Sequence, residues 1–176
     1  MSEAHLKQSK HLSFILRHRP EAAGLKLDKD GWAEIADIIS NTDITVGVLY
    51  EIVRTDSKGR YSLNSDRTKI RANQGHSTDM VDLKFKQAVP PPWLFHGTDT
   101  RAVSDILKHG LLPMNRHYVH LSKDVETAVN VGSRRKNGFT ILKIDAAKMT
   151  SDGLKFFVSD NGVWLATAVP PKYIST

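Results

Sequence analysis

Three prolines in a row at positions 90–92 divide the 176-residue chain near its middle. Each proline ring fixes φ and removes a backbone donor, and the residue before a proline is pushed away from helical geometry. Such a segment favours a stiff, extended connector. We therefore expect two lobes, residues 1–87 and 93–176, joined by a linker at residues 88–92. The length is compatible with two small domains, each able to bury a core.

The composition is that of a folded protein with an excess of positive charge. Apolar residues make up 40% and charged residues 25% of the chain, which argues against extensive disorder. No apolar run is long enough to cross a bilayer, and the first ten residues lack the apolar core of a signal peptide, so we expect a cytoplasmic protein. The absence of cysteine excludes disulfides and thiolate chemistry. The net charge of +6 favours a polyanionic partner, although it also serves solubility.

The apolar spacing of the N-terminal half predicts three helices followed by a β-hairpin. Leu12, Ile15 and Leu16 share one helical face. Thr45 is a candidate cap of the third helix. Three helices followed by a β-ribbon is the order of a winged-helix module. The expected elements are a helix ending before Pro20, a helix over residues 32–39, a helix after Thr45, and strands at residues 60–63 and 69–72.

The C-terminal half alternates short strands with helices, which predicts a compact α+β domain but not its strand order. Gly110 and Gly132 are candidate helix ends. Ser122 is a candidate cap for the helix that ends near Gly132. The expected strands are residues 93–96, 119–121, 140–144, 154–158 and 163–166.

Standard nucleotide motifs are missing, because the chain has neither a phosphate-binding G-x-x-x-x-G-K-[ST] loop nor a G-x-G-x-x-G turn. Any phosphate would therefore be held by side chains, and arginine suits this task because its planar fork donates two parallel hydrogen bonds. Arg17, His18 and Arg19 lie at a predicted helix end and form the first candidate cluster. The same cations could simply complement the helix dipole.

A second candidate cluster follows the strand at residues 69–72. Residues 73–77 bring an amide pair, a glycine, an imidazole and a hydroxyl into five positions. Glycine permits close backbone approach to a ligand, and such polar density after a strand is common in ligand sites. A turn that satisfies its own hydrogen bonds is the alternative.

Histidines mark further candidates in the second half. His96 ends a predicted strand and is followed by Gly97 and Thr98, while His120 lies in another strand. Each could contact a nucleotide, or each could be a hydrogen-bonded histidine at a strand edge. Because the histidines at 109, 117 and 120 have neither cysteine nor a group of acidic ligands nearby, we expect no metal site. The basic run at residues 132–136 is either a further anion contact or a solvated loop.

Taken together, these segments resemble the tRNA 2′-phosphotransferases, NAD-dependent enzymes that remove an internal 2′-phosphate from RNA. The resemblance covers nearly the whole chain, and its most specific parts are the Arg17-His18 pair and the RANQGHS run at residues 71–77. It implies a winged-helix lobe joined to an ADP-ribosyltransferase-like lobe. It extends through HGT at residues 96–98, VHLS at residues 119–122, GSR at residues 132–134 and NGVWL at residues 161–165.

The resemblance also implies residue roles. The family's essential Arg-His-Arg-Arg set falls on Arg17, His18, Arg71 and Arg134, with Arg134 preferred over Arg135 by its spacing from the glycine. The family's His-His-apolar triad falls on His96, His120 and Val163, in place of the His-Tyr-Glu of protein-modifying relatives. The remaining NAD contacts implied are Gly97, Thr98, Leu121 and Ser122, and the RNA or phosphate contacts are Lys69, Asn73, Gln74, His76 and Ser77.

The implied reaction has two steps and needs no metal. The RNA 2′-phosphate displaces nicotinamide from NAD to give 2′-phospho-ADP-ribosylated RNA. The ribose 2″-hydroxyl then attacks the phosphate and releases 2′-hydroxyl RNA and ADP-ribose 1″,2″-cyclic phosphate. A phosphate monoester is mostly dianionic at neutral pH and needs no general base. This agrees with the scarcity of glutamate in residues 93–176, where Glu126 stands alone. We expect a monomer.

Two other functions stay open at this point. The helix order and the basic residues between positions 54 and 71 are also compatible with a regulator that binds duplex DNA. An ADP-ribosyltransferase acting on protein or on terminal phosphates is the other alternative.

Overall fold

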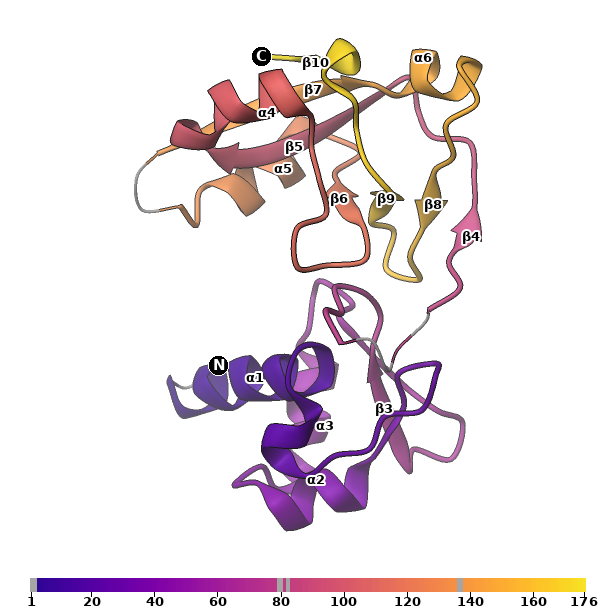
Figure 1. The fold of residues 1–176 in the computed structure, drawn as a ribbon. Coiled ribbons are helices and arrows are strands. Elements are labelled where there is room, and N and C mark those ends of the chain that lie inside the picture. The colour runs from indigo at the N-terminus through magenta and orange to yellow at the C-terminus, as the bar shows by residue number, and fades with distance from the viewer. Residues whose placement is uncertain (1–2, 79–80, 82, 136–137) are drawn as a thin grey trace. The chain divides into compact units, whose positions relative to one another are not determined.

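The structure, a computed structural model, describes residues 3–78, 81, 83–135 and 138–176. The chain divides into two units, Met1–Lys84 and Phe85–Thr176, and each has its own hydrophobic core (Figure 1). Helices and small antiparallel sheets occur in both units. The expected α+β class is therefore confirmed.

The first unit packs its helices against a three-stranded antiparallel sheet of order β1-β3-β2. The predicted apolar face of the first helix is fully buried at Leu12, Ile15 and Leu16. Thr45 caps the third helix, since its side chain accepts a hydrogen bond from the backbone N–H of Val48. The elements are α1 (Glu3–Arg17), η1 (Pro20–Ala23), β1 (Ala33–Glu34), α2 (Ile35–Asn41), α3 (Val46–Arg54), β2 (Tyr61–Leu63) and β3 (Lys69–Ala72).

The second helix begins at Ile35, later than the sequence predicts. Ala33 pairs with Ile70 of β3 in an antiparallel register, and the N–H of Ile35 donates to the carbonyl of Thr68 at 2.9 Å. Because this strand pairing satisfies the backbone, the residues before Ile35 are extended although their apolar spacing suits a helix.

The second unit contains two antiparallel sheets, of order β10-β7-β5 and β4-β8-β9-β6. Phe95 and Ser122 join them by exchanging backbone hydrogen bonds of 2.9 and 2.8 Å. The elements are β4 (Lys86–Gln87), β5 (Trp93–Asp99), η2 (Thr100–Ala102), α4 (Val103–His109), β6 (Val119–Leu121), α5 (Val125–Gly132), β7 (Phe139–Asp145), α6 (Ala146–Ser151), β8 (Phe157–Val158), β9 (Trp164–Ala166), η3 (Pro171–Tyr173) and β10 (Ile174–Ser175).

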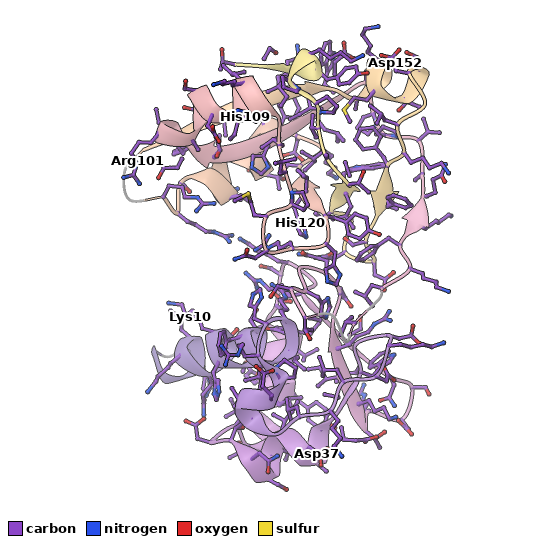
Figure 2. The ribbon with its side chains drawn as sticks, in the orientation of Figure 1. Lys10, Asp37, Arg101, His109, His120 and Asp152 are labelled. Carbon is purple, nitrogen blue, oxygen red and sulfur yellow. The ribbon has the colours of Figure 1, made fainter. Side chains whose placement is uncertain are left out.

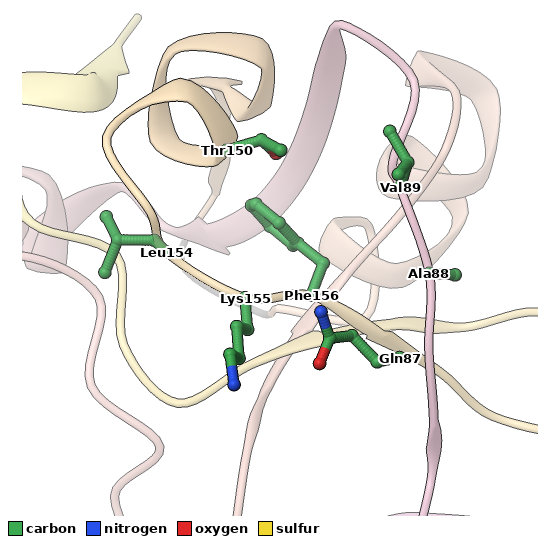
Figure 3. Close-up of a pocket in the computed structure, with 7 residues that line it drawn as sticks. All are labelled: Gln87, Ala88, Val89, Thr150, Leu154, Lys155 and Phe156. Carbon is green, nitrogen blue, oxygen red and sulfur yellow. The ribbon is translucent and has the colours of Figure 1, made fainter.

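The proline segment belongs to the second unit. Strand β4 pairs with β8, the N–H of Ala88 donates to the carbonyl of Phe156 at 3.1 Å, and the carbonyl of Pro92 accepts from Ala147 at 3.0 Å. The division between the units therefore lies at 84/85, whereas the sequence placed residues 85–87 in the first lobe and a linker at 88–92. A cavity of about 270 Å³ (Figure 3) is lined by Gln87, Ala88, Val89, Thr150, Leu154, Lys155 and Phe156, none of which is a predicted site residue.

Strand β5 runs through His96 to Asp99, although the sequence predicted its end at His96. The strand continues because Gly97, Thr98 and Asp99 pair with β7. A Cβ at Gly97 would lie 2.4 Å from the carbonyl oxygen of Ala128 in α5. The bare backbone at this position lets α5 pack directly on the strand. Asp124 rather than the expected Ser122 caps α5, accepting a hydrogen bond from the N–H of Thr127 at 2.7 Å.

Candidate functional site

The first group of predicted site residues gathers at the C-terminal end of α1. The N–H of Ser77 donates to the carbonyl of Arg17 at 2.9 Å, and the Ser77 hydroxyl lies 2.9 Å from Nδ1 of His18. The N–H of His18 still donates to the carbonyl of Phe14, so His18 continues the last helical turn. Backbone and side chain of one serine thus hold both members of the Arg17-His18 pair.

Gly75 lies against the Arg17 side chain in this group. The glycine has φ of +87°, a region that residues with a Cβ rarely adopt, and the Cδ and guanidinium atoms of Arg17 lie 3.7–3.8 Å from where its Cβ would be. Arg71 leaves β3 with its Cζ 4.7 Å from the ring centre of Trp32, a cation–π contact. The Nε atoms of Arg17 and Arg71 are both buried. Each of these two guanidinium groups is therefore partly sheltered from solvent.

Asn73 and His76 belong to the same turn and have buried side chains. Asn73 is buried, and its amide accepts from the Ser62 hydroxyl at 2.7 Å and donates to the carbonyl of Gly59 at 2.8 Å. His76 is also buried, and its Nε2 would lie 3.3 Å from a Cβ at Gly31. The hydrogen bonds of Asn73 therefore fix the start of the turn that carries Gly75 and Ser77.

Lys69 and Gln74 are more accessible than these two. Lys69 forms a salt bridge with Glu34 at 3.1 Å, and this hydrogen bond raises the pKa of Lys69. Gln74 is partly exposed in the same turn as Gly75. Of the residues predicted to contact RNA, these two and Ser77 present polar atoms nearest the solvent.

In the second unit, β5 and β6 bring His96 and His120 together. The Nδ1 atom of His96 lies 2.9 Å from the carbonyl oxygen of His120. Because a carbonyl only accepts, Nδ1 carries the hydrogen and Nε2 of the neutral ring is an acceptor. Burial lowers the pKa of His96, and the charges of Arg135 and Arg116 lower it further, while the bond to His120 opposes them. His96 is therefore neutral at pH 7.

His120 has the opposite tautomer. Its Nδ1 lies 3.3 Å from Nη1 of Arg116, and a guanidinium only donates, so Nδ1 accepts and Nε2 carries the hydrogen. Figure 2 labels His120 among the side chains of the second unit. The two rings together offer an acceptor on His96 and a donor on His120, which suits a ligand with hydroxyl or amide groups.

Arg116 and Arg135 complete this second group, and the sequence reasoning missed the first and ranked the second below Arg134. Both residues are exposed; partial desolvation lowers the pKa of Arg116, and the charge of Arg135 adds to that effect, so these two guanidinium groups act on each other as well as on His96. Arg134 follows α5 directly and is exposed, as Arg116 and Arg135 are. The position of Arg116 just before the His117–Ser122 run is the signal that could have drawn attention to it.

The other residues predicted to contact the nucleotide are held in place by burial or by backbone hydrogen bonds. Thr98 is buried beside Gly97 in β5, and Leu121 belongs to the core. Ser122 is held by the backbone bridge to β5. Val163 precedes β9, where its N–H donates to the Ser159 hydroxyl and its carbonyl accepts from the Ser159 N–H, both at 3.0 Å.

Within the described ranges, no three His, Asp or Glu side chains gather as a metal site would require. His109 is one of the three histidines considered as metal ligands in the sequence. Its Nδ1 lies 2.8 Å from the carboxylate of Asp105 in the same helix. No helix among the described residues is both long and apolar enough to cross a membrane.

Comparison with known proteins matches residues 3–168 to the family described as "RNA 2'-phosphotransferase, Tpt1 / KptA family". A protein of Rhizobium johnstonii named probable RNA 2′-phosphotransferase is 50% identical over 95% of this chain and 91% of its own length. Proteins with the same name from Burkholderia pseudomallei and Fusobacterium nucleatum are 47% and 45% identical, each over 96% of this chain and over 93% and 97% of their own lengths. The chain therefore belongs to the RNA 2′-phosphotransferase family.

Proposed function

We propose that this protein transfers the internal 2′-phosphate of RNA to NAD, giving 2′-hydroxyl RNA, nicotinamide and ADP-ribose 1″,2″-cyclic phosphate. The observation that carries the proposal is the group formed by Arg17, His18, Gly75 and Ser77 at the end of α1. It unites the two most distinctive sequence segments in a chain that belongs to this family. In this view the first unit is a winged-helix lobe and the second an ADP-ribosyltransferase-like lobe.

The first unit would bind the RNA phosphate. Arg17 and Arg71 carry fixed positive charges whose buried nitrogen atoms are sheltered from water, which strengthens their attraction for a dianion. A phosphate monoester is already mostly ionised at pH 7, so the group has to orient it rather than deprotonate it. Lys69 and Gln74 would add contacts at the edge of the same group, and Ser77 would orient the His18 ring.

The second unit would bind NAD as the other substrate, and its donor set fits that ligand. Neutral His96 accepts at Nε2 and His120 donates at Nε2, which matches the paired donor and acceptor groups of a ribose hydroxyl or a carboxamide. Gly97 and Thr98 flank His96, and Leu121 and Ser122 flank His120. Val163 would contribute an apolar surface where a transferase acting on a neutral acceptor needs a carboxylate. NAD supplies a ribose carbon with a good leaving group.

The chemistry balances without an added oxidant or metal. In the first step a phosphate oxygen bonds to the ribose C1″ and the bond to nicotinamide breaks, leaving 2′-phospho-ADP-ribosylated RNA. In the second step the 2″-hydroxyl gives its proton to solvent water and attacks phosphorus, and the bond to the RNA 2′-oxygen breaks. That oxygen needs a proton, which His18 would give as the general acid. Arg134 would stabilise the charge that builds on the phosphorus oxygens.

The test incubates the protein with NAD and a 2′-phosphorylated oligonucleotide, with chelator present and absent, and follows nicotinamide and RNA. Equal release of nicotinamide and 2′-hydroxyl RNA supports the proposal. ADP-ribose bound stably to protein or to an RNA end would point to a different transferase. Tight duplex DNA binding with no NAD consumption would point to a regulator.

A further inference from the structure

We propose that the exposed side of α1 is a binding track for the single-stranded RNA that flanks the 2′-phosphate. The track consists of Lys7, Lys10, His11 and Phe14 and leads to His18. This inference rests on the proposed function for its choice of ligand. It concerns a surface of the first unit outside the group formed by Arg17, His18, Gly75 and Ser77.

The spacing of these residues places them along one side of the helix. Positions 7, 11, 14 and 18 are separated by three or four residues, the spacing that repeats one helical face, and Lys10 lies beside them. Lys7, Lys10, His11 and Phe14 are all exposed, whereas the opposite face at Leu12, Ile15 and Leu16 is fully buried. Figure 2 labels Lys10, whose side chain extends from α1.

Phe14 distinguishes this face from an ordinary solvated helix surface. Its side chain is 45% exposed, although a phenylalanine with no ligand would gain by burial. Its ring centre lies 6.3 Å from that of His18, at an interplanar angle of 50°. An exposed aromatic ring one turn from the proposed acid is placed where a base next to the reacting nucleotide could stack.

The charge on this face complements RNA. Lys7 and Lys10 carry no salt bridge among those found for the described residues. Among the side chains that the structure describes, Asp43 is the acidic group recorded against the track, with its carboxylate 4.0 Å from Nδ1 of His11. Proteins that bind single-stranded nucleic acids combine cations with aromatic rings. The bases stack on the rings, and the phosphates face the lysines.

The length of the track sets the size of the RNA. Eleven positions separate Lys7 from His18, and a helix rises about 1.5 Å per residue, so the track extends about 16 Å. A stacked strand rises about 3.4 Å per nucleotide, so about five flanking nucleotides would cover it. An RNA with one nucleotide on each side of the phosphate would not reach the lysines.

Binding is tested without any transfer reaction, by the fluorescence anisotropy of a labelled single-stranded RNA at several salt concentrations. Each phosphate contact contributes about 0.7 to the slope of log affinity against log salt, so Lys7→Gln with Lys10→Gln should reduce the slope by about 1.4. The control pair Lys26→Gln and Lys29→Gln removes two exposed lysines outside α1 and should leave the slope unchanged. Equal slopes for the two double variants, or a wild-type protein without measurable affinity, would overturn the track.

Phe14 is tested in the same binding assay. Phe14→Leu should weaken binding about tenfold at unchanged salt slope, and Phe14→Trp should restore it, because stacking needs an aromatic ring rather than an apolar one. Equal affinity of the leucine variant and the wild type would overturn the role of the ring.

Turnover then separates the track from the proposed function. Lys7→Gln with Lys10→Gln should raise KM for an RNA with about six nucleotides on each side and leave turnover of the one-nucleotide RNA, which does not reach the lysines, unchanged. Equal losses on both RNAs would overturn the track, since they would indicate a structural defect around His18. If the wild-type protein processes neither RNA, the proposed function fails, and the binding data still decide whether the track exists.

Discussion

The side chains of His18 and Ser77 meet at 2.9 Å although 59 positions separate them in the chain. The N–H of the same serine holds the carbonyl of Arg17, so the turn after β3 and the end of α1 are joined at two points. This junction converts two short sequence motifs into one group with a cation and an imidazole in fixed places.

Removing the Ser77 hydroxyl should loosen the His18 ring without disturbing the backbone. We expect Ser77→Ala to lower kcat about tenfold, the effect of one hydrogen bond, with little change in KM for RNA. Ser77→Thr should restore most of the activity. Steady-state kinetics with Ser57→Ala, an exposed serine of the same unit, provides the control. A rise in KM at constant kcat would show that Ser77 binds RNA rather than orients the acid.

The adjacent arginines after α5 should differ in their effects. Arg134→Ala should lower turnover by about two to three orders of magnitude, because in the proposed reaction Arg134 stabilises the charge that develops on the phosphorus oxygens. Arg135→Ala should instead raise the pKa of His96, since Arg135 is one of the charges that lower it. Kinetics and NMR titration of both variants check this. Loss of turnover in Arg135→Ala with normal turnover in Arg134→Ala would reverse the assignment.

The pKa of His96, lowered mainly by burial, predicts how the second unit responds to acid. An imidazole in the unfolded chain titrates near pH 6.5. Between that pH and the lower folded value, the unfolded state binds more protons, so stability falls as the pH drops through this window and levels off below it. His96→Gln should remove this dependence. Urea unfolding at several pH values measures this pH dependence of the free energy of unfolding. A stability that rises as the pH falls below the pKa of a free imidazole would contradict the prediction.

Gly97 predicts a packing defect. A Cβ there would lie 2.4 Å from the carbonyl oxygen of Ala128 and 2.9 Å from the N of Gly132, both backbone atoms of α5 that cannot rotate away. We expect Gly97→Ala to destabilise the second unit by about 1–3 kcal/mol. Gly47→Ala in α3 meets nothing within 4 Å and should stabilise the first unit by about 0.5–1 kcal/mol. Chemical denaturation followed by NMR resonances of each unit measures both changes in stability. An unchanged stability of Gly97→Ala would mean that α5 does not pack as described.

Local pattern was enough to predict most elements of this chain. The buried face of α1, the Thr45 cap of α3 and the two hairpin strands follow from apolar period and capping chemistry. Strands β1, β4 and β10 were missed because each has two residues and exists only through a distant partner. The division between units was misplaced for the same reason, since pairing of β4 with β8 draws the residues before the prolines into the second unit.

The candidate site was predicted as a set of residues but not as a geometry. Motifs identified Arg17, His18 and Ser77, and could not show that the serine bonds to both of the others. They also placed Asn73 among RNA contacts, whereas its amide is bonded inside the first unit. Arg116 was missed because a basic residue in a loop has no periodic signal, and its relation to His120 exists only in three dimensions.

The most direct measurement follows the phosphorus atom itself. An oligonucleotide carrying a radiolabelled internal 2′-phosphate is incubated with the protein and NAD, and the labelled product is identified by mass and chromatography. We expect the label to appear in ADP-ribose 1″,2″-cyclic phosphate, one per nicotinamide released and only when NAD is present. Label released as inorganic phosphate, or at the same rate without NAD, would contradict it.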